Sequence, residues 1–129
     1  MTVYLNAQQV LFAHDRLIAR TGGSHGVRDV GLLESAVARP HATFDGVDLY
    51  RDIFSKAAAL MESLILNPPF VDGNKRTAIT VASLFLLRND IQVVADNAEL
   101  ERFTMWIVTN RPAPADVSVW FQTNTEALL

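Results

Sequence analysis

The sequence predicts a mainly α protein: a single domain over residues 1–129 with about six helices around one apolar core. Two observations support this fold class. Apolar residues recur at intervals of three and four through most of the chain, which is the spacing of one helical face. Half of the 129 residues are apolar and 19% are charged, a composition that allows a chain to bury a core and excludes intrinsic disorder.

The first two helices have recognisable ends. Asn6 and Gln9 have the spacing of a capping box, so the first helix is expected to begin just after Asn6. The Thr21-Gly22-Gly23 turn ends it, because glycine adopts the left-handed conformation of a helix C-terminus. Asp29 is the expected N-cap of a second helix over Val30–Arg39, which the following proline closes.

The middle of the chain predicts a flap and a central helix. Residues 40–48 form a loop that is the best candidate for a flexible flap beside a site, where His41 would line that site. Residues 49–66 are expected to form a helix that is apolar nearly all round, which is typical of a buried helix. Two prolines after Asn67 end it, since proline cannot continue a helix.

The second half of the chain predicts three more helices, over residues 74–88, from Asp96 or Asn97 through Ile107, and over residues 117–125. Residues 91–95 alternate weakly and form either a short strand or an extended link. The proline-rich residues 111–114 make a rigid turn before the last helix.

Charge and hydropathy exclude two classes of partner. The formal net charge is −3 and no block of Lys and Arg occurs, so the chain lacks the basic surface of a nucleic-acid-binding protein. The longest nearly apolar run, residues 78–87, is shorter than the ~20 residues of a membrane span. The N-terminus has no signal-peptide pattern. A cytoplasmic protein without nucleic-acid or membrane contacts is therefore expected.

The residues that commonly bind transition metals are sparse. There is no cysteine, which excludes disulfides and thiolate metal sites. The three histidines lack the spacing of zinc ligands. His14 falls on the apolar face of the first helix and is expected to be a hydrogen-bonded core or rim histidine, whereas His25 is expected to be solvated.

Residues 69–77 form a polar segment between two strongly apolar helices. The first turn of a helix has free N–H groups and a partial positive charge, so it attracts anions. Lys75 and Arg76 add two full positive charges there, and a bound phosphate would remove their conflict with the helix dipole. Asp72 is placed to hold a hard cation such as Mg²⁺ that bridges phosphates. These residues indicate a nucleotide-phosphate cradle. A plainer interpretation makes Asp72 an N-cap, Gly73 a turn residue and the two bases solvated surface charges.

The same segment resembles the core motif of the Fic/Doc family in its Doc (death-on-curing toxin) form. That motif reads His, any residue, Phe, any residue, Asp or Asn, Gly or Ala, Asn, Lys, Arg, and residues 69–76 match it from its second position on. The similarity extends upstream through residues 21–40 and 49–60, so it covers most of the chain. Lys75 and Ile79 point to the Doc form, since the adenylylating Fic branch has Gly and a second Arg at these positions.

The resemblance implies a toxin of a toxin–antitoxin module, a kinase that transfers phosphate from ATP to a threonine of elongation factor Tu and arrests translation. It also implies an antitoxin partner, a segment of which would bind as a helix in an apolar groove. The motif residues would each supply one part of the site: Phe70 the anchor of the loop in the core, Asp72 the Mg²⁺ ligand, Gly73 and Asn74 the shape of the anion hole, and Lys75 and Arg76 the phosphate-binding cations.

One departure from the motif concerns its first residue. The family's general base, a histidine, is replaced here by Pro68, which has no titratable group. Loss of a positioned base typically costs about 10²–10⁴-fold in rate, so the chain as written is expected to be a crippled enzyme. Two explanations stay open: selection against a toxic activity removed the base, or the chain is a degenerate member of the family. The intact residues 72–76 favour the first, and a His codon at position 68 of the native gene would support it.

Three other interpretations remain. The site transfers AMP instead of phosphate, as in the Fic branch. Alternatively, the chain is a non-catalytic module whose apolar groove receives an antitoxin segment. The third is a helical structural domain without a ligand, which predicts no rise in melting temperature with nucleotide.

Overall fold

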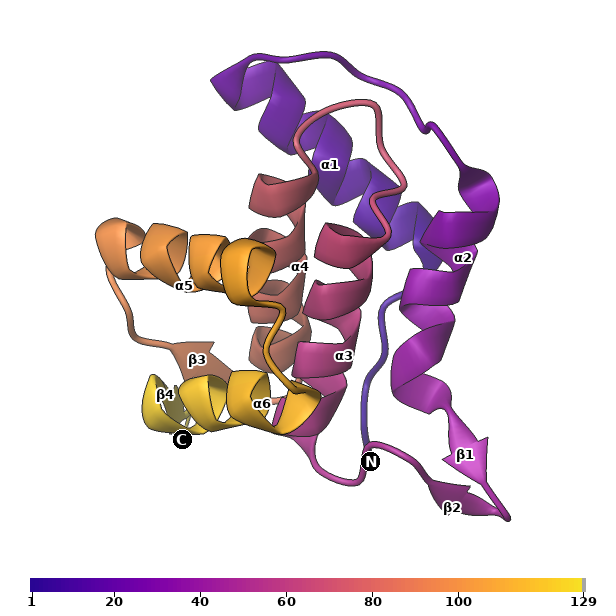
Figure 1. Ribbon diagram of the computed structural model, residues 1–129, viewed down its shortest axis with the longest axis vertical. Helices are drawn as coiled ribbons and strands as arrows, with labels where there is room; N and C mark the ends of the chain where they lie inside the picture. Colours follow the sequence, from indigo (N-terminus) through magenta and orange to yellow (C-terminus); the bar gives the residue numbers. More distant parts are fainter. Residues whose placement is uncertain (129) are drawn as a thin grey trace.

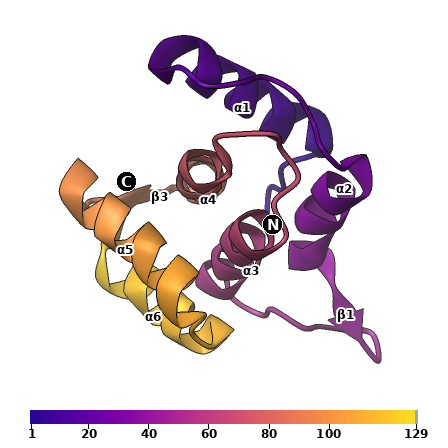
Figure 2. The ribbon, with the colours of Figure 1, turned by 45° about the horizontal axis from the view of Figure 1, so that its top comes forward.

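Helix α3 (Ile53–Leu66) is the centre of the fold (Figure 1). The computed structural model describes residues 1–128, and within them α3 packs against α2, α4, α5 and α6. Every residue from Lys56 to Ile65 is buried, as the all-round apolar pattern predicts. Figure 2 looks nearly along α3 and α4 and shows α1 and α2 on one side of this pair, with α5 and α6 on the other.

The other helices of the described chain are α1 (Ala7–Thr21), α2 (Val30–Ala38), α4 (Asn74–Arg88), α5 (Asn97–Asn110) and α6 (Pro114–Thr123). The strands are β1 (Thr43–Phe44), β2 (Val47–Asp48), β3 (Ile91–Val93) and β4 (Thr125–Ala127). They form two antiparallel pairs, β1 with β2 and β3 with β4. The mainly α prediction with about six helices is confirmed.

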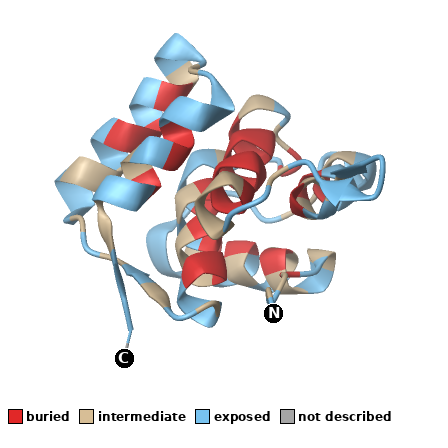
Figure 3. Cartoon of the chain, turned by 90° about the horizontal axis from the view of Figure 1, so that it is seen from below, coloured by how far each residue is buried: buried red, intermediate tan, exposed pale blue. Residues whose placement is uncertain are grey.

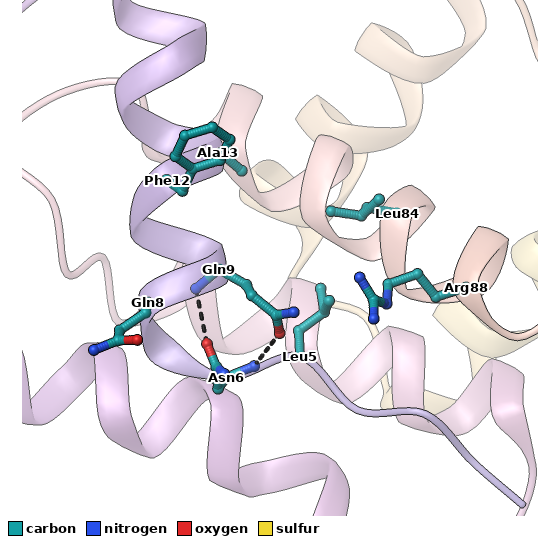
Figure 4. Close-up of a pocket in the computed structure, with 8 residues that line it drawn as sticks. All are labelled: Leu5, Asn6, Gln8, Gln9, Phe12, Ala13, Leu84 and Arg88. Carbon is teal, nitrogen blue, oxygen red and sulfur yellow. Dashed lines mark hydrogen bonds between the residues drawn. The ribbon is translucent and has the colours of Figure 1, made fainter.

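The predicted N-caps explain where several helices begin. The N–H of Gln9 donates to Asn6 Oδ1 at 2.8 Å, and the N–H of Asn6 donates to Gln9 Oε1 at 2.9 Å (Figure 4). Asp29 Oδ1 accepts from the N–H of Leu32 at 3.1 Å, and Asp96 forms a second capping box at the start of α5. Each such cap is typically worth about 1 kcal/mol, and its residues lie within one turn of each other, so these boundaries follow from local sequence.

α3 begins later than the apolar pattern predicts, at Ile53 rather than near residue 49. Asp52 is its N-cap, because Oδ1 accepts from the N–H of Ser55 at 2.8 Å. α2 likewise ends at Ala38, and a 3₁₀ turn over Arg39–His41 carries the chain toward the hairpin.

The C-terminal elements also shift from their predicted positions. α6 begins at Pro114, three residues before residue 117, because proline is favoured in the first turn of a helix. It ends at Thr123, and the following residues form β4, which pairs Ala127 with Ile91 and Thr125 with Val93. The segment predicted as strand or link is therefore a short strand, and its partner strand was not predicted.

The prediction that residues 40–48 form a flexible flap beside the site is wrong. Residues 43–48 form the β1–β2 hairpin, which lies at the N-terminal end of α3, whereas the loop between α3 and α4 follows its C-terminal end (Figure 1). The 14 residues of α3 separate the two by about 21 Å. The His41 ring stacks on Tyr4 with centroids 3.6 Å apart and does not reach that loop.

Buried residues gather on α3 and α4 and on the helices packed against them, and the β1–β2 hairpin is exposed (Figure 3). Phe70, Phe85 and Phe121 are among the largest fully buried side chains. Phe70 comes from the loop between α3 and α4, which ties this loop to the core as predicted. Within residues 1–128, none of the helices combines the length and the hydrophobicity that crossing a membrane requires.

Candidate active site

Residues 68–73, here called the motif loop, connect α3 to α4. Gly73 is the N-cap of α4 and has φ 75°, the left-handed conformation that glycine adopts without strain. The Thr77 N–H donates to the Gly73 carbonyl at 3.0 Å, the first hydrogen bond of the helix. The N–H groups of residues 74–76 precede this ladder and are available to an anion.

Asn74 closes the motif loop with its side-chain amide. Its Oδ1 accepts from the Phe70 N–H at 2.9 Å, and its Nδ2 donates to the Phe70 carbonyl at 3.0 Å. Both ends of the amide are thus occupied by backbone. Asn74 therefore shapes the loop with its side chain, while its backbone N–H remains for a ligand.

Asp72 carries the carboxylate of the motif loop. Its Oδ2 accepts from the Ser24 N–H at 3.1 Å and its Oδ1 from the Gly73 N–H at 2.8 Å. These two backbone hydrogen bonds are the main reason that the pKa of Asp72 lies below its usual value, and Arg76 lowers it further. Asp72 is therefore ionised at neutral pH. The plainer interpretation of Asp72 as an N-cap is wrong, because Gly73 holds that position, while Gly73 as a turn residue is confirmed.

The donor set around Asp72 fits Mg²⁺ only with help from a ligand. Among residues 1–128 there is no group of three His, Asp or Glu side chains that could hold a metal ion. Magnesium is commonly bound by one or two carboxylates together with water and substrate phosphates. Asp72, exposed and ionised, has free lone pairs for this kind of site.

Lys75 and Arg76 are exposed in the first turn of α4. The Arg76 guanidinium donates to the hydroxyl of Thr21 at the end of α1. Both side chains line a cavity of about 660 Å³ that lies between α1, α4 and α5. The apolar part of its wall includes Leu17, Ile79, Leu100 and Met105. The cations thus stand at one edge of a hollow with an apolar wall. A different hollow, between the start of α1 and the end of α4, lies at the other end of these helices (Figure 4).

The backbone of the motif loop at and after Pro68 is held by hydrogen bonds to residues 26–29. The guanidinium of Arg28 donates to the Pro68 carbonyl, and the N–H groups of Arg28 and Asp29 donate to the Pro69 carbonyl at 2.7 and 3.0 Å. The Val71 N–H donates to the Gly26 carbonyl at 3.1 Å. Residues 26–29 therefore clamp the motif loop on one side. This contact joins residues about 40 positions apart, and no local pattern in the sequence indicates it.

His14 packs under the motif loop. The side chain is fully buried, its Nε2 lies 2.8 Å from the Asp72 carbonyl oxygen, and its ring stacks on Phe70 with centroids 3.8 Å apart. The prediction of a hydrogen-bonded core histidine is confirmed. His25 is exposed, as predicted, and its ring lies 3.3 Å from Asp15. The contact between His14 and the motif loop was not predicted from the sequence.

Replacing Gly23 by Ala is expected to weaken about tenfold the Mg²⁺–ATP binding that the resemblance implies. A Cβ at Gly23 would lie 2.6 Å from Asp72 Oδ2 and push the carboxylate out of its place. Mg²⁺ binding would then have to return the carboxylate to its place, and a cost of about 1.4 kcal/mol for that step corresponds to tenfold in affinity. Isothermal titration calorimetry with Mg²⁺–ATP measures the change in affinity.

Gly22→Ala is the matched control. Both glycines have positive φ, 89° and 112°, so both substitutions strain the backbone, but a Cβ at Gly22 meets nothing within 4 Å. Affinity within about twofold of the parent is expected for Gly22→Ala. Equal losses in both variants would mean that backbone strain, and not the Asp72 carboxylate, controls binding.

Comparison with known proteins places this geometry in a family. Residues 4–86 match the model of the Fic/DOC family. A protein of Mycolicibacterium smegmatis named Toxin Doc is 51% identical over 96 residues, which cover 74% of this chain and 72% of that protein. A protein of Escherichia phage P1 named Protein kinase doc is 31% identical over 115 residues, covering 89% and 90% of the two chains. The chain therefore belongs to the Fic/DOC family.

Proposed function

We propose that this chain is a Doc-type toxin whose site transfers the γ-phosphate of ATP to a threonine of elongation factor Tu, in the cytoplasm, and so arrests translation. The observation that carries the proposal is the start of α4, where Lys75 and Arg76 stand beside free N–H groups and the ionised Asp72. Two relatives, one named a toxin and one a protein kinase, support the same conclusion.

The chemistry needs positioning and charge neutralisation more than covalent participation. The threonine Oγ forms a bond to the γ-phosphorus, the bond from that phosphorus to the bridging oxygen of ADP breaks, and the hydroxyl proton leaves. Lys75, Arg76 and the N–H groups of the first turn bind the phosphate oxygens as their negative charge redistributes. Asp72 would hold Mg²⁺, which would supply neutralisation of phosphate charge.

The proton of the threonine hydroxyl has no acceptor at position 68. Pro68 lacks a titratable group, so this proton must pass to water instead of to a positioned base. The backbone there is nevertheless fixed by Arg28, and the other motif residues keep their geometry. Binding of nucleotide is therefore expected to survive in this chain, while transfer is slow.

Transfer of AMP is the competing reaction within this family. Ile79 lines the cavity one turn below Lys75, at a position where the resemblance assigns the Fic branch a second arginine. An apolar side chain there leaves the positive charge concentrated on Lys75, Arg76 and the helix start. We take that concentration of charge near one phosphate group of the bound ATP as the feature that favours phosphate transfer over AMP transfer.

The antitoxin partner is proposed to cover the same site. The cavity between α1, α4 and α5 joins an apolar wall to two exposed cations. An amphipathic helix with apolar residues on one face and carboxylates at its edge would match both features. A non-catalytic module that only binds such a segment is the alternative, and Pro68 is the observation that favours it.

Lys75→Ala is expected to weaken binding of Mg²⁺–ATP at least tenfold, because one charge-assisted contact to phosphate is lost. Mg²⁺–ATP should raise the melting temperature of the parent chain, and it should raise that of the variant by less. Arg51→Ala is the control, since Arg51 is also exposed but precedes α3 at the end remote from the motif loop. A parent chain with no nucleotide-dependent shift would contradict the proposal.

A further inference from the structure

We propose that His14 is the positioning residue of the motif loop: through one hydrogen bond and one ring contact it sets the orientation of the Asp72–Gly73 peptide and hence of the Asp72 carboxylate. This inference rests on the proposed function for its effect on nucleotide binding. Its structural part concerns α1 and the motif loop alone, and it is tested separately below.

The proton position on His14 follows from its partner. A backbone carbonyl oxygen only accepts hydrogen bonds, so Nε2, 2.8 Å from the Asp72 oxygen, must carry the hydrogen. Nδ1 is buried and has no hydrogen-bond partner among residues 1–128, and the nearest carboxylate oxygen, Asp15 Oδ1, is 3.7 Å away. The motif loop therefore fixes which nitrogen of His14 is protonated.

The hydrogen bond from His14 orients the whole peptide unit between Asp72 and Gly73, not only the Asp72 carbonyl. A peptide unit is planar, and its C=O and N–H point in opposite directions. With the Asp72 carbonyl turned toward buried His14, the N–H of Gly73 faces away from the core, where it donates to Asp72 Oδ1 at 2.8 Å. Rotation of this peptide would break both hydrogen bonds and leave the carboxylate that is proposed to hold Mg²⁺ with the Ser24 N–H as its remaining backbone donor.

The ring of His14 holds a second point of the motif loop. It stacks nearly parallel to the Phe70 ring, at an interplanar angle of 4°, and both side chains are almost fully buried. Asn74 binds the Phe70 backbone with its amide, so Phe70 is fixed by its ring and by its peptide groups. His14 thus connects the anchored residue to the carboxylate two positions later.

The space around Gly73 agrees with this role. A Cβ at Gly73 would lie 2.9 Å from Ile18 Cδ1 and 3.7 Å from His14 Nε2. Ile18 Cδ1 is the flexible end of a side chain, and 3.7 Å from His14 Nε2 is an ordinary van der Waals distance. Side chains of α1 thus pack directly against the motif loop at Gly73.

Two substitutions separate the hydrogen bond from the ring. His14→Gln keeps an N–H donor at the reach of Nε2 but removes the ring, and His14→Phe keeps an aromatic ring but removes the donor. His14→Phe is expected to weaken Mg²⁺–ATP binding about tenfold and to speed hydrogen exchange of the hydrogen-bonded Gly73 and Thr77 amides by at least as much. His14→Gln is expected to restore both to within about threefold of the parent. His25→Phe, in an exposed loop, should change neither.

The outcomes decide the inference in each case. If His14→Gln loses as much as His14→Phe, or if neither variant changes exchange, the positioning role is overturned. If the parent chain binds no Mg²⁺–ATP, the proposed function fails, and the exchange data still decide the role of His14. Should His14→Phe not fold, nitrogen-15 NMR of the parent gives the answer: a proton on Nε2 supports the inference, and a proton on Nδ1 contradicts it.

Discussion

Replacing Pro68 by His is expected to raise the rate of phosphate transfer about 10²–10⁴-fold, which is the usual contribution of a positioned general base. The remainder of the site needs no rearrangement. The carbonyl of residue 68 is held by Arg28 and that of residue 69 by two N–H groups, and all three hydrogen bonds end on backbone oxygens that remain when residue 68 is a histidine. Transfer from γ-labelled ATP into proteins of a bacterial lysate measures the gain.

Pro68→Gln is the control for the return of a backbone N–H and a polar side chain at this position. Glutamine has no titratable group, so its rate is expected to stay near that of the Pro68 chain. A gain in Pro68→Gln equal to that in Pro68→His would show that proline disturbs the motif loop by its backbone, and that the missing base is not the cause.

Phe70→Ala is expected to destabilise the fold by about 3–5 kcal/mol. The Phe70 side chain is 1% exposed and stacks on His14, so truncation leaves a cavity at the point where the motif loop enters the core. For a domain of this size the loss corresponds to roughly 10–20 °C in melting temperature. Thermal or urea unfolding measures it.

Val71→Ala is the matched comparison, because Val71 is the next residue and 57% exposed. Its expected cost is within about 0.5 kcal/mol. A loss below about 1 kcal/mol in Phe70→Ala would contradict the assignment of Phe70 as the anchor of the motif loop.

The start of α4 could be predicted from the sequence because its determinants are local. Gly73 provides the left-handed N-cap, and Lys75 and Arg76 follow within one helical turn. The same holds for α1, α2 and α5, whose caps lie three residues from their partners. The family motif then assigned roles to residues that are adjacent in the chain.

The contacts that hold the motif loop could not be predicted, since they join distant residues. His14 and Asp72 are 58 positions apart, and Arg28 and Pro68 are 40 apart. A histidine on an apolar helical face gives no sign of the carbonyl that it will bind. The prediction that the segment of the β1–β2 hairpin forms a flap beside the site was wrong for a related reason. The hairpin is near α3 in sequence, but this does not say which end of α3 lies at the site.

The central claim is that the site of this family member transfers a phosphate rather than a nucleotide. The most direct measurement incubates Pro68→His protein, beside the chain as given, with bacterial lysate and ATP labelled on either the α- or the γ-phosphate. We predict γ-label on one band of the size of elongation factor Tu, and only with the His variant. α-Label on that band would contradict the claim in favour of AMP transfer, and no label from either protein would contradict it in favour of a non-catalytic antitoxin-binding module.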